Sequence, residues 1–475
     1  MYCLQRMFSI RSARVQNEDI AREDDTMHKL DLIVIGSGVS GHSTASAARR
    51  KGWTVAVIDD KPFGGTCPQW GCDPKKVLIE TVRIQDAFDR MKNYGLTGNA
   101  QLDWSKLREH KETFTEPIPK MTVEEFKNDG IEVYQGHAQF IDDHTVQVNG
   151  EKLQASYILI ASGASPAKLP VDGFEHLVSS DAFFELHELP QELVLIGGGY
   201  ISFEFAHIAA RFNRKVTLIQ RGERPLKGFD EDVVNHLVAY SKKLGIDIRT
   251  NTELESVEKQ GNKFIVSVRS GNQTEKISAD IVIHGAGRTP NVLEMGLEQT
   301  SISYSKKGIK VDKNQQSISA PHIYAAGDCA DDGKLPLTPL ASEAGSRVIH
   351  HMLEGKQQDE FNHVQPSIVY TIPGIASVGM SADEAAKAQD KYTVIEQDLS
   401  SFFTNKITRL EEGFSKIILD KEKQVIVGAH IYAAHAQHLI NVFTLAIEME
   451  APVQMLQSLL WAYPTAESDI PSMLQ

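Results

Sequence analysis

Short apolar runs that lead into glycine recur along this chain. Residues 32–35, 157–160, 193–196 and 281–283 each form such a run. Apolar runs of this length, without polar alternation, are typical of strands that are buried on both faces of a parallel sheet. Helix-like stretches separate several of these strands, so the pattern predicts an α/β fold.

The first run opens a complete dinucleotide-binding pattern. Its parts are, in order, Gly36, Gly38, Gly41, a helix-like stretch over residues 45–50, a strand over residues 54–58, and Asp59. The glycines permit a tight turn and a close approach of the backbone to a pyrophosphate, which the helix N-terminus faces. Asp59 lies 23 residues after Gly36, where an acid can bond a ribose hydroxyl.

The same pattern returns 161 residues later, starting at Gly197. Gly199 holds the second glycine position, Ser202 replaces the third glycine, and Gln220 stands where the first copy has Asp59. Two such units indicate that one chain binds two nucleotide cofactors.

Positive charges close to Gln220 bear on the choice of nucleotide at the second unit. An acid at this position would repel a 2′-phosphate, whereas a nearby arginine accommodates one. The sequence supplies Arg221, Arg224 and Lys227 there. We therefore predict NADPH rather than NADH. The alternative is that these cations belong to a solvated loop.

The remaining segments predict further helices and strands. Residues 111–129 have the pattern of one helix, and residues 131–148 that of short strands. Residues 231–270 predict a helix followed by hairpin strands, and residues 322–328 predict a strand that ends at Gly327 and Asp328. Beyond these, the sequence predicts strands over residues 377–379, 414–419 and 425–431 and helices over residues 382–388 and 438–449.

Composition sets broad limits on the class of protein. The length of 475 residues suggests about three domains, and 41% apolar and 24% charged residues are usual for a globular chain. A formal charge of −14 argues against nucleic acid as the main partner. No apolar stretch approaches the roughly 18 residues that a membrane span needs. Four cysteines are too few for a disulfide scaffold and indicate a reducing compartment, the cytoplasm.

Residues 1–30 differ from the rest and predict an unstructured extension. Arg6, Arg11 and Arg14 precede an acidic run, and no apolar region of a secretion signal is present. The interpretation that we favour is a segment that does not fold, or a start placed too early, with Met27 as the true beginning. The alternative is an organellar transit peptide.

Two cysteines stand close together directly after a glycine-rich turn. Cys67 and Cys72 are five residues apart and follow Gly64 and Thr66. A disulfide that closes so short a loop removes little entropy from the unfolded chain, so it is a poor stabiliser. An accessible bridge has a more oxidising potential than a buried structural one. We therefore interpret the pair as a reversible two-electron store.

With these motifs, residues 31–475 resemble the pyridine nucleotide–disulfide oxidoreductases, the group of glutathione reductase, lipoamide dehydrogenase and mercuric reductase. The matching residues are Gly36, Gly38, Gly41, Gly64, Thr66, Cys67, Cys72, Pro74, Lys76, Gly197, Gly199, Tyr200, Ile201, Glu204, Gly285, Gly287, Arg288, Pro290, Asn291, Ala325, Gly327 and Asp328. That set, in this order, is highly specific to the superfamily.

The resemblance implies FAD at the first unit, NADPH at the second and a homodimer. The implied fold class is α/β, with two Rossmann-like dinucleotide-binding domains and a C-terminal α+β dimerisation domain. The implied segments are an extension over residues 1–30, an FAD-binding domain over 31–165, an NAD(P)-binding domain over 166–290, a central FAD-binding segment over 291–357 and the dimerisation domain over 358–475.

Carried over position by position, the resemblance also implies roles for single residues. Cys72 would be the thiol beside the flavin, and Cys67 the outer thiol that attacks the substrate. Lys75 or Lys76 would pair with Glu204 and place a positive charge near the flavin, which stabilises its reduced form. Which lysine does so stays open. The other implied cofactor contacts are Tyr200 at the nicotinamide and Asp328 at the ribityl chain. Around the two nucleotides we expect Asp59, Gly64, Thr66, Ala138, Gly163, Ile201, Gly287 and Gly327, and the cations expected at the second nucleotide are Arg221 and Lys227.

The C-terminus departs from relatives that reduce disulfides. They carry a histidine before a proline and a glutamate five residues after that histidine, and the histidine serves as acid–base for thiol exchange. Here Tyr463 replaces the histidine and Ser468 the glutamate, with Glu467 one residue early. A phenol with a pKa near 10 is a poor base at neutral pH. General acid–base catalysis typically contributes a factor of about 10² to 10⁴ to the rate. We predict slowed exchange with alkyl disulfides, although Tyr463 can still donate a proton.

A second departure is Asp73, where relatives usually carry an aliphatic residue. Its carboxylate should raise the pKa of Cys72 unless Lys75 or Lys76 offsets it, and the alternative is an Asp that simply faces solvent. Cys329 is interpreted as a packing residue. His435 and His438 have no acid or cysteine at ligand spacing, so we predict no metal site.

The main hypothesis is therefore an enzyme that passes electrons from NADPH through FAD and the Cys67–Cys72 pair to a small disulfide or another thiol-reducible acceptor. In the alternative, electrons leave the flavin directly for a quinone, oxygen or a metal ion. Ser46 and Arg347 fall near positions where glutathione reductases often bind substrate through arginine, which is too little to name the acceptor.

Overall fold

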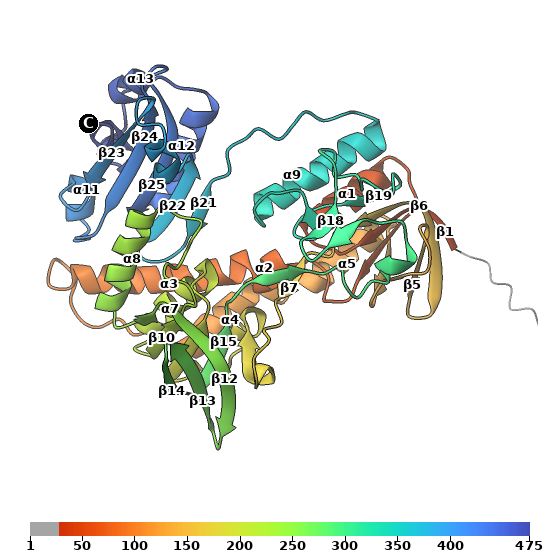
Figure 1. Cartoon of the computed structure of the whole chain (residues 1–475), viewed down its shortest axis with the longest axis horizontal. Helices are drawn as coiled ribbons and strands as arrows, with labels where there is room; N and C mark the ends of the chain where they lie inside the picture. The colour runs from red at the N-terminus through yellow and green to blue at the C-terminus, as the bar shows by residue number, and fades with distance from the viewer. Residues whose placement is uncertain (1–27) are drawn as a thin grey trace, which may run out of the picture.

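Three sheets organise the chain in the computed structural model, which describes residues 28–475 (Figure 1). The first sheet has seven strands in the order β3-β2-β1-β6-β5-β4, with β19 paired to β6 as well. Its strands are β1 His28–Ile35, β2 Val55–Asp59, β3 Glu132–Gln135, β4 Gln139–Phe140, β5 Thr145–Val148, β6 Glu151–Ile160 and β19 Ile323–Ala325. The parallel pairing of β19 with β6 returns a late segment of the chain to the first sheet.

The glycine-rich turn after β1 is as tight as its sequence predicts. Only three residues separate Ile35, the end of the strand, from the start of helix α1 Val39–Arg50. A Cβ on Gly36 would lie 2.2 Å from the carbonyl oxygen of Ala161, and one on Gly41 would lie 2.0 Å from that of Gly36. Only glycine therefore fits both positions, and the N-terminus of α1 faces the carboxyl end of the sheet.

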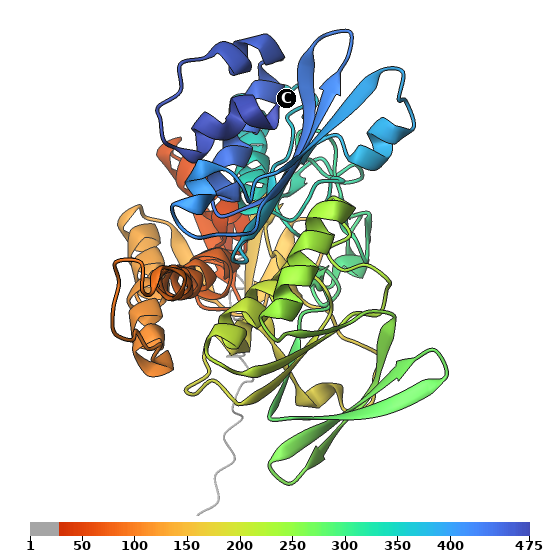
Figure 2. The same cartoon turned by 90° about the vertical axis from the view of Figure 1, so that its left-hand side faces the viewer.

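The second sheet repeats this arrangement with five parallel strands in the order β11-β10-β9-β15-β8. These are β8 Leu177–Ser179, β9 Glu192–Ile196, β10 Lys215–Ile219, β11 Asp247–Arg249 and β15 Ile281–His284, with helices α7 Tyr200–Arg211 and α8 Glu231–Lys243. Strands β12 Thr252–Gln260, β13 Lys263–Ser270 and β14 Gln273–Ala279 form an antiparallel sheet that projects from this part (Figure 2).

The third sheet belongs to the C-terminal part, which a long connection separates from the first sheet (Figure 1). Its five antiparallel strands run in the order β21-β22-β25-β24-β23. They are β21 Ser367–Val369, β22 Gly374–Gly379, β23 Tyr392–Asp398, β24 Phe414–Asp420 and β25 Val425–Ala433. Helix α12 Ala436–Glu448 packs its buried face, including Leu439 and Phe443, into the core on this sheet.

Shorter elements complete the fold. The strands are β7 Ala164–Pro166, β16 Arg288–Pro290, β17 Tyr304–Ser305, β18 Gly308–Lys310 and β20 Ala330–Asp331. The helices are α2 Thr66–Trp70, α6 Ser180–Phe183, α9 Thr338–Val348, α10 Ala382–Ala386, α11 Phe403–Lys406, α13 Val453–Ser458 and α14 Ile470–Met473. Within residues 28–475 we find no helix that is long and apolar enough to cross a membrane.

One predicted helix is wrong. The pattern over residues 111–129 predicts a single helix, but the chain forms α4 Trp104–Thr115 and α5 Ile118–Asn128. Pro117 lies between them and caps α5. A proline lacks the amide N–H and its ring clashes with the preceding turn, so one helix cannot continue through this position.

Helix α3 Cys72–Met91 joins the three parts of the molecule. Its buried Leu78 and Val82 belong to one core cluster with Phe203 of α7 and with Val369 and Tyr432 of the C-terminal sheet. The α/β fold class, with two dinucleotide-type sheets and a C-terminal α+β part, is confirmed, and α3 is the element that connects these parts.

Candidate active site

The two cysteines lie on consecutive helices that share one sharp turn. Cys67 is in the first turn of α2, and Cys72 is the first residue of α3. Gly71 links the two helices, and a Cβ there would lie 2.9 Å from the carbonyl oxygen of Thr66. Both cysteines are free thiols. The N-terminus of a helix favours a negative charge, so Cys72 is placed where a thiolate is stabilised.

A threonine from a distant helix contacts both sulfurs. Thr338 begins α9, and its hydroxyl donates to Cys67 Sγ over 3.2 Å. The same oxygen lies 3.5 Å from Cys72 Sγ. A hydroxyl hydrogen bond stabilises a thiolate more than a thiol, so Thr338 favours ionisation of the pair.

The surroundings give the two thiols opposite acidities. The pKa of Cys72 is lowered to about 6, first by its hydrogen bond with Cys67 and then by Thr338, Lys76 and Lys75, although burial opposes them. The pKa of Cys67 is raised, first by the same hydrogen bond with Cys72 and then by burial. At neutral pH the pair therefore holds one proton, on Cys67, and a thiolate on Cys72.

Both lysines pair with Glu204, which settles the alternative that the sequence left open. The side chain of Glu204, 1% exposed, places Oε2 2.9 Å from Lys75 Nζ and 3.3 Å from Lys76 Nζ. Its Oε1 accepts the backbone N–H of Tyr370 over 2.8 Å. Burial alone would raise the pKa of Glu204, but the two lysine charges hold it below its usual value. The cluster keeps a net positive charge beside Cys72.

Asp73, next to Cys72 at the start of α3, is exposed. Burial raises the pKa of Asp73 and the charge of Lys76 opposes this change, while the charge of Asp73 raises the pKa of Cys67. The pKa of Cys72 is nevertheless lowered. Asp73 is thus exposed and is not among the main groups that shift the pKa of Cys72, which agrees with the alternative of an Asp that faces solvent.

An elongated cavity connects the first glycine turn with the sulfurs. Its lining contains thirteen of the predicted site residues: Gly36, Gly38, Asp59, Thr66, Cys67, Cys72, Lys75, Ala138, Gly163, Tyr200, Ile201, Gly327 and Asp328. Gly41 and Gly64 lie behind this lining, where a Cβ on Gly64 would lie 2.5 Å from Ile118 Cγ2.

The donors and acceptors of this cavity fit an FAD molecule. The carboxylate of Asp328 accepts no hydrogen bond from any residue within 28–475, and burial raises its pKa. Asp59 accepts from the N–H and the hydroxyl of Ser37, at 2.8 and 2.6 Å, which fixes its orientation at the end of β2. A Cβ on Gly65 would lie 2.5 Å from Gly38 Cα, so only glycines leave the backbone exposed to a pyrophosphate there.

A second cavity adjoins the first across Tyr200. Gly199, Tyr200, Ile201, Gly287 and Asp328 are among its lining residues. The ring of Tyr200 lies 4.9 Å from Lys75 Nζ and is 41% exposed. Tyr200 thus stands between the two cavities, where a nicotinamide would have to approach a flavin.

The cations near Gln220, at the end of β10, differ in whether they have a partner for an ion pair. The Gln220 side chain accepts from the N–H of Gly198 over 2.9 Å, in place of the acid of the first copy. Arg224 is held by Glu231 at 3.1 Å and by the carbonyl oxygen of Lys227. The side chains of Arg221 and Lys227 form no ion pair with another described residue and face solvent.

Tyr463 is not brought to the cysteine pair within the chain. Its side chain is 74% exposed, and its ring stacks on Phe403 with centroids 6.2 Å apart. Ser468 has a structural role, because Ser468 and Thr465 form a reciprocal capping box at the following 3₁₀ turn. The side chain of Glu467 forms no hydrogen bond or ion pair with any residue within 28–475, so neither Tyr463 nor Glu467 acts as a base at the sulfurs of its own chain.

Several sequence-based interpretations of single residues can be judged from burial. Arg347 is 6% exposed and bonds to Glu343 and to the carbonyl oxygens of Lys313 and Asp359, so it is not free for a substrate. Cys329 is fully buried and donates to the carbonyl oxygen of Ile160, as a packing residue would. In the described part of the chain, no group of three or more His, Cys, Asp or Glu side chains is arranged to hold a metal ion.

The sequence missed Thr338 and Tyr370, which contact the cysteines and Glu204 from far along the chain. Neither lies in a motif with a recognisable spacing.

Comparison with known proteins agrees with this geometry. Residues 30–345 match the family model described as pyridine nucleotide-disulphide oxidoreductase, and residues 365–474 match the dimerisation domain of the same family. Glutathione reductase of Burkholderia cepacia is 33% identical over 443 residues, covering 92% of this chain and 97% of that protein. A dihydrolipoyl dehydrogenase of Bacillus subtilis is 30% identical over 445 residues, covering 92% and 96%.

A solved structure shares the fold over nearly the whole chain. The HOCl-induced flavoprotein disulfide reductase RclA from Escherichia coli superposes with a TM-score of 0.83 at 23% identity, covering 94% of this chain and 99% of that one. The chain belongs to the FAD-dependent pyridine nucleotide–disulfide oxidoreductases and carries their dimerisation domain, which supports a homodimer.

Proposed function

We propose that this enzyme reduces a small disulfide, or another thiol-reducible compound, with electrons from NADPH that pass through FAD and the Cys67–Cys72 pair. The observation that carries the proposal is the acidity of the pair. Cys72 is a thiolate at neutral pH, next to Thr338 and two lysines at the end of the long cavity. Cys67, the more basic thiol, would attack the acceptor.

FAD would be held along the first cavity. The backbone of Gly36 and Gly38 would face its pyrophosphate, Asp59 its ribose and Asp328 its ribityl chain, with Thr66, Ala138, Gly163 and Gly327 around it. When bound, FAD supplies the redox chemistry that converts a hydride from the nicotinamide into two electrons for the cysteine sulfurs. Lys75, which lines the cavity, would keep a permanent positive charge near the ring.

NADPH would bind at the second glycine turn, from Gly197 to Gly199, with its nicotinamide behind Tyr200. The choice of NADPH over NADH rests on Arg221 and Lys227, which have no carboxylate partner, whereas Glu231 already holds Arg224. A 2′-phosphate would find two cations without a carboxylate partner, and Gln220 in place of the acid of the first copy.

The remaining proposals concern assembly. We assign FAD binding to residues 31–165 and 291–357, NAD(P)H binding to 166–290 and dimerisation to 358–475. Tyr463 would act on the cysteine pair of the other subunit, because its exposed ring lies on the dimerisation domain away from its own sulfurs. There it would donate a proton rather than accept one.

Substitution of each cysteine tests the route. Cys67→Ser should abolish reduction of 2-hydroxyethyl disulfide, glutathione disulfide and other disulfides with NADPH. It should leave the long-wavelength thiolate–flavin absorbance intact, and in Cys72→Ser that absorbance should vanish. Disulfide reduction at the wild-type rate by Cys67→Ser would contradict the proposal.

A second candidate function has one observation in its favour, the exposed Tyr463 in the position of a base. In this alternative, electrons leave the flavin directly for a quinone, oxygen or a metal ion, and the cysteines only modulate the reaction. Cys67→Ser again decides, because acceptor turnover would survive the substitution in this case. A screen of disulfides, quinones and metal ions with the same variant would then identify the acceptor.

A further inference from the structure

A single buried glutamine fastens the helix of the first cysteine to the turn that precedes this helix. Gln69 belongs to the five-residue helix α2 and is 4% exposed. Its Nε2 donates to three backbone carbonyl oxygens, those of Pro62 at 3.0 Å, Phe63 at 3.2 Å and Gly65 at 3.0 Å. An amide nitrogen carries two hydrogens, so one of them is shared between two of these oxygens. The side chain of Gln69 thus gathers the carbonyl groups of the turn around one nitrogen.

Helix α2 depends on such contacts for its position. A helix of five residues closes too few backbone hydrogen bonds to be stable alone. Trp70, its last residue, packs against the core cluster that contains Leu78. Gln69 holds the turn from which the helix starts. The position of Cys67, which lies in the same short helix, therefore depends on the amide of Gln69.

The same turn is also bonded to the predicted ribose site. The N–H of Gly64 donates to Ser37 Oγ over 2.8 Å. The hydroxyl of Ser37 donates in turn to Asp59 Oδ2 over 2.6 Å, and Ser37 is only 1% exposed. Hydrogen bonds therefore connect the carboxylate of Asp59, through Ser37 and the turn, with the amide of Gln69.

On the basis of the proposed function, in which Asp59 binds FAD and Cys67 attacks the acceptor, we propose that Gln69 is a positioning residue that couples FAD binding to the placement of Cys67. Without its amide, the carbonyl oxygens of the turn lose their donor inside the protein, and the turn rearranges to reach water. That rearrangement loosens the hydrogen bonds to Asp59 and frees α2 at the same time. FAD is then held less tightly, and Cys67 no longer stays beside Cys72.

The variant Gln69→Leu in the full-length, FAD-loaded enzyme tests this coupling. Leucine keeps a buried side chain of similar size but donates no hydrogen bond. We expect FAD to be released about 10-fold faster, measured as the rise of flavin fluorescence after dilution. We also expect the midpoint of the thiolate–flavin absorbance to rise by about one pH unit. The reason is that a displaced Cys67 no longer stabilises the Cys72 thiolate through their hydrogen bond.

The variant Gln69→Glu has the same size and reverses the polarity of the contact. Its carboxylate would face carbonyl oxygens without a hydrogen to donate, so both effects should be larger than in Gln69→Leu. Wild-type behaviour of Gln69→Glu would show that the turn does not need a donor, and it would overturn the proposal.

A milder variant, Ser37→Ala, tests the other end of the same hydrogen-bond connection. It should change FAD release and the absorbance midpoint in the same directions. If both residues act through one connection, the double variant Ser37→Ala/Gln69→Leu should release FAD within about 2-fold of the more affected single variant. Effects of the two substitutions that multiply in the double variant would indicate two independent contacts and contradict the coupling.

The matched control is Gln316→Leu. The amide of Gln316 also donates to a backbone carbonyl oxygen, that of Pro321 at 2.6 Å, but Gln316 lines neither cavity. FAD release and the absorbance midpoint should stay at wild-type values. In Gln69→Leu, wild-type FAD release, or faster release with an unchanged midpoint, would overturn the proposal. Neither measurement needs an acceptor, so they remain decisive if Cys67→Ser still reduces disulfides and the proposed function fails.

Discussion

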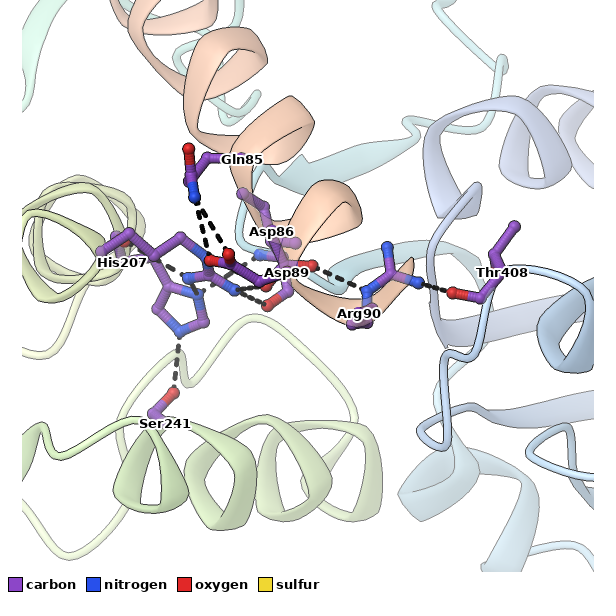
Figure 3. A network of polar contacts seen from close by, with 9 residues as sticks. Gln85, Asp86, Asp89, Arg90, His207, Ser241 and Thr408 are labelled. Carbon is purple, nitrogen blue, oxygen red and sulfur yellow. Dashed lines mark hydrogen bonds and ion pairs between the residues drawn. The ribbon is translucent and has the colours of Figure 1, made fainter. Parts of the chain in front are cut away.

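Helices α3 and α7 meet at two buried ion clusters that are built alike and differ in one respect. Near the sulfurs, Lys75 and Lys76 of α3 share the carboxylate of Glu204 on α7. At the far end the carboxylate comes from α3 instead, and Arg211 of α7 and Arg90 of α3 share Asp86, at 2.8 and 3.0 Å (Figure 3). Each cluster holds two cations for one carboxylate.

Both clusters also hold the same turn of the C-terminal part, between β21 and β22. Glu204 accepts the N–H of Tyr370, while at the far end Arg211 donates to the carbonyl oxygen of Ile372. His207 accepts the N–H of Ile372 at Nδ1 and contacts Ser241 of α8 through Nε2 (Figure 3). Burial and the charge of Arg211 keep the pKa of His207 well below its usual value, so this histidine is neutral.

The difference lies in the type of cation. Arginine stays charged at every relevant pH, so the far cluster is a fixed ionic contact between α3, α7 and the turn at Ile372. Lysine shifts its pKa when it is buried, and only the near cluster has a cysteine beside it. The contact between α3 and α7 therefore holds the parts of the fold together at the Asp86 end and sets the charge beside the cysteines at the Glu204 end.

Substitution of Glu204 should have the largest effect. Glu204→Gln retains the acceptor for the Tyr370 N–H but leaves Lys75 buried without a carboxylate. We expect a loss of about 3 to 5 kcal/mol in the free energy of unfolding, together with a fall of roughly 100-fold in NADPH-driven turnover. Denaturant unfolding and steady-state rates measure these two losses.

Glu192→Gln is the matched control, because Glu192 also pairs with two lysines, Lys215 at 3.0 Å and Lys263 at 2.6 Å, but at the surface. Exposed ion pairs contribute about 0 to 1 kcal/mol, so its stability should hardly change. Equal free energies of unfolding for Glu204→Gln and Glu192→Gln would show that Glu204 contributes no more to stability than an exposed ion pair.

Asp86→Asn should separate assembly from chemistry. It leaves Arg211, whose side chain is 7% exposed, without its carboxylate. We expect a loss of about 3 kcal/mol in the free energy of unfolding, while the thiolate–flavin absorbance and turnover of the folded enzyme stay at wild-type values. A tenfold slower turnover in folded enzyme would mean that the far cluster also sets the active-site geometry.

Thr338→Val should have the smallest effect and act only at the sulfurs. In the wild type the thiolate–flavin absorbance should appear as pH rises through about 6, the pKa of Cys72. Removal of the hydroxyl should move this midpoint upward by roughly one unit, since a lost hydrogen bond costs about 1 kcal/mol. Absorbance measured against pH gives the midpoint.

The control for this titration is Thr44→Val. The hydroxyl of Thr44 is buried in α1 and has no hydrogen-bond partner within residues 28–475. Its removal should therefore leave the midpoint unchanged. A midpoint at the wild-type pH in Thr338→Val would show that the threonine does not stabilise the thiolate.

Much of the fold followed from local patterns. The two glycine turns and the strands that precede them lie where the sequence predicts them, because turn geometry and strand burial depend on neighbours in the chain. The sequence pattern did not predict helix α3, because its first residues were assigned to the cysteine motif. It also predicted one helix where α4 and α5 are separated at Pro117. Of the extension predicted over residues 1–30, residues 1–27 lie outside the described residues, and residues 28–30 correct the prediction because they belong to strand β1.

The sequence by itself determined that two dinucleotide units and a cysteine pair exist, because glycine positions, apolar runs and a five-residue spacing are local properties of the chain. Only the tertiary structure decided which groups meet at the sulfurs. Thr338 reaches Cys67 across 271 positions of sequence, and Tyr370 reaches Glu204 across 166. Charge and proton transfer depend on such distances in space, which no spacing along the chain specifies.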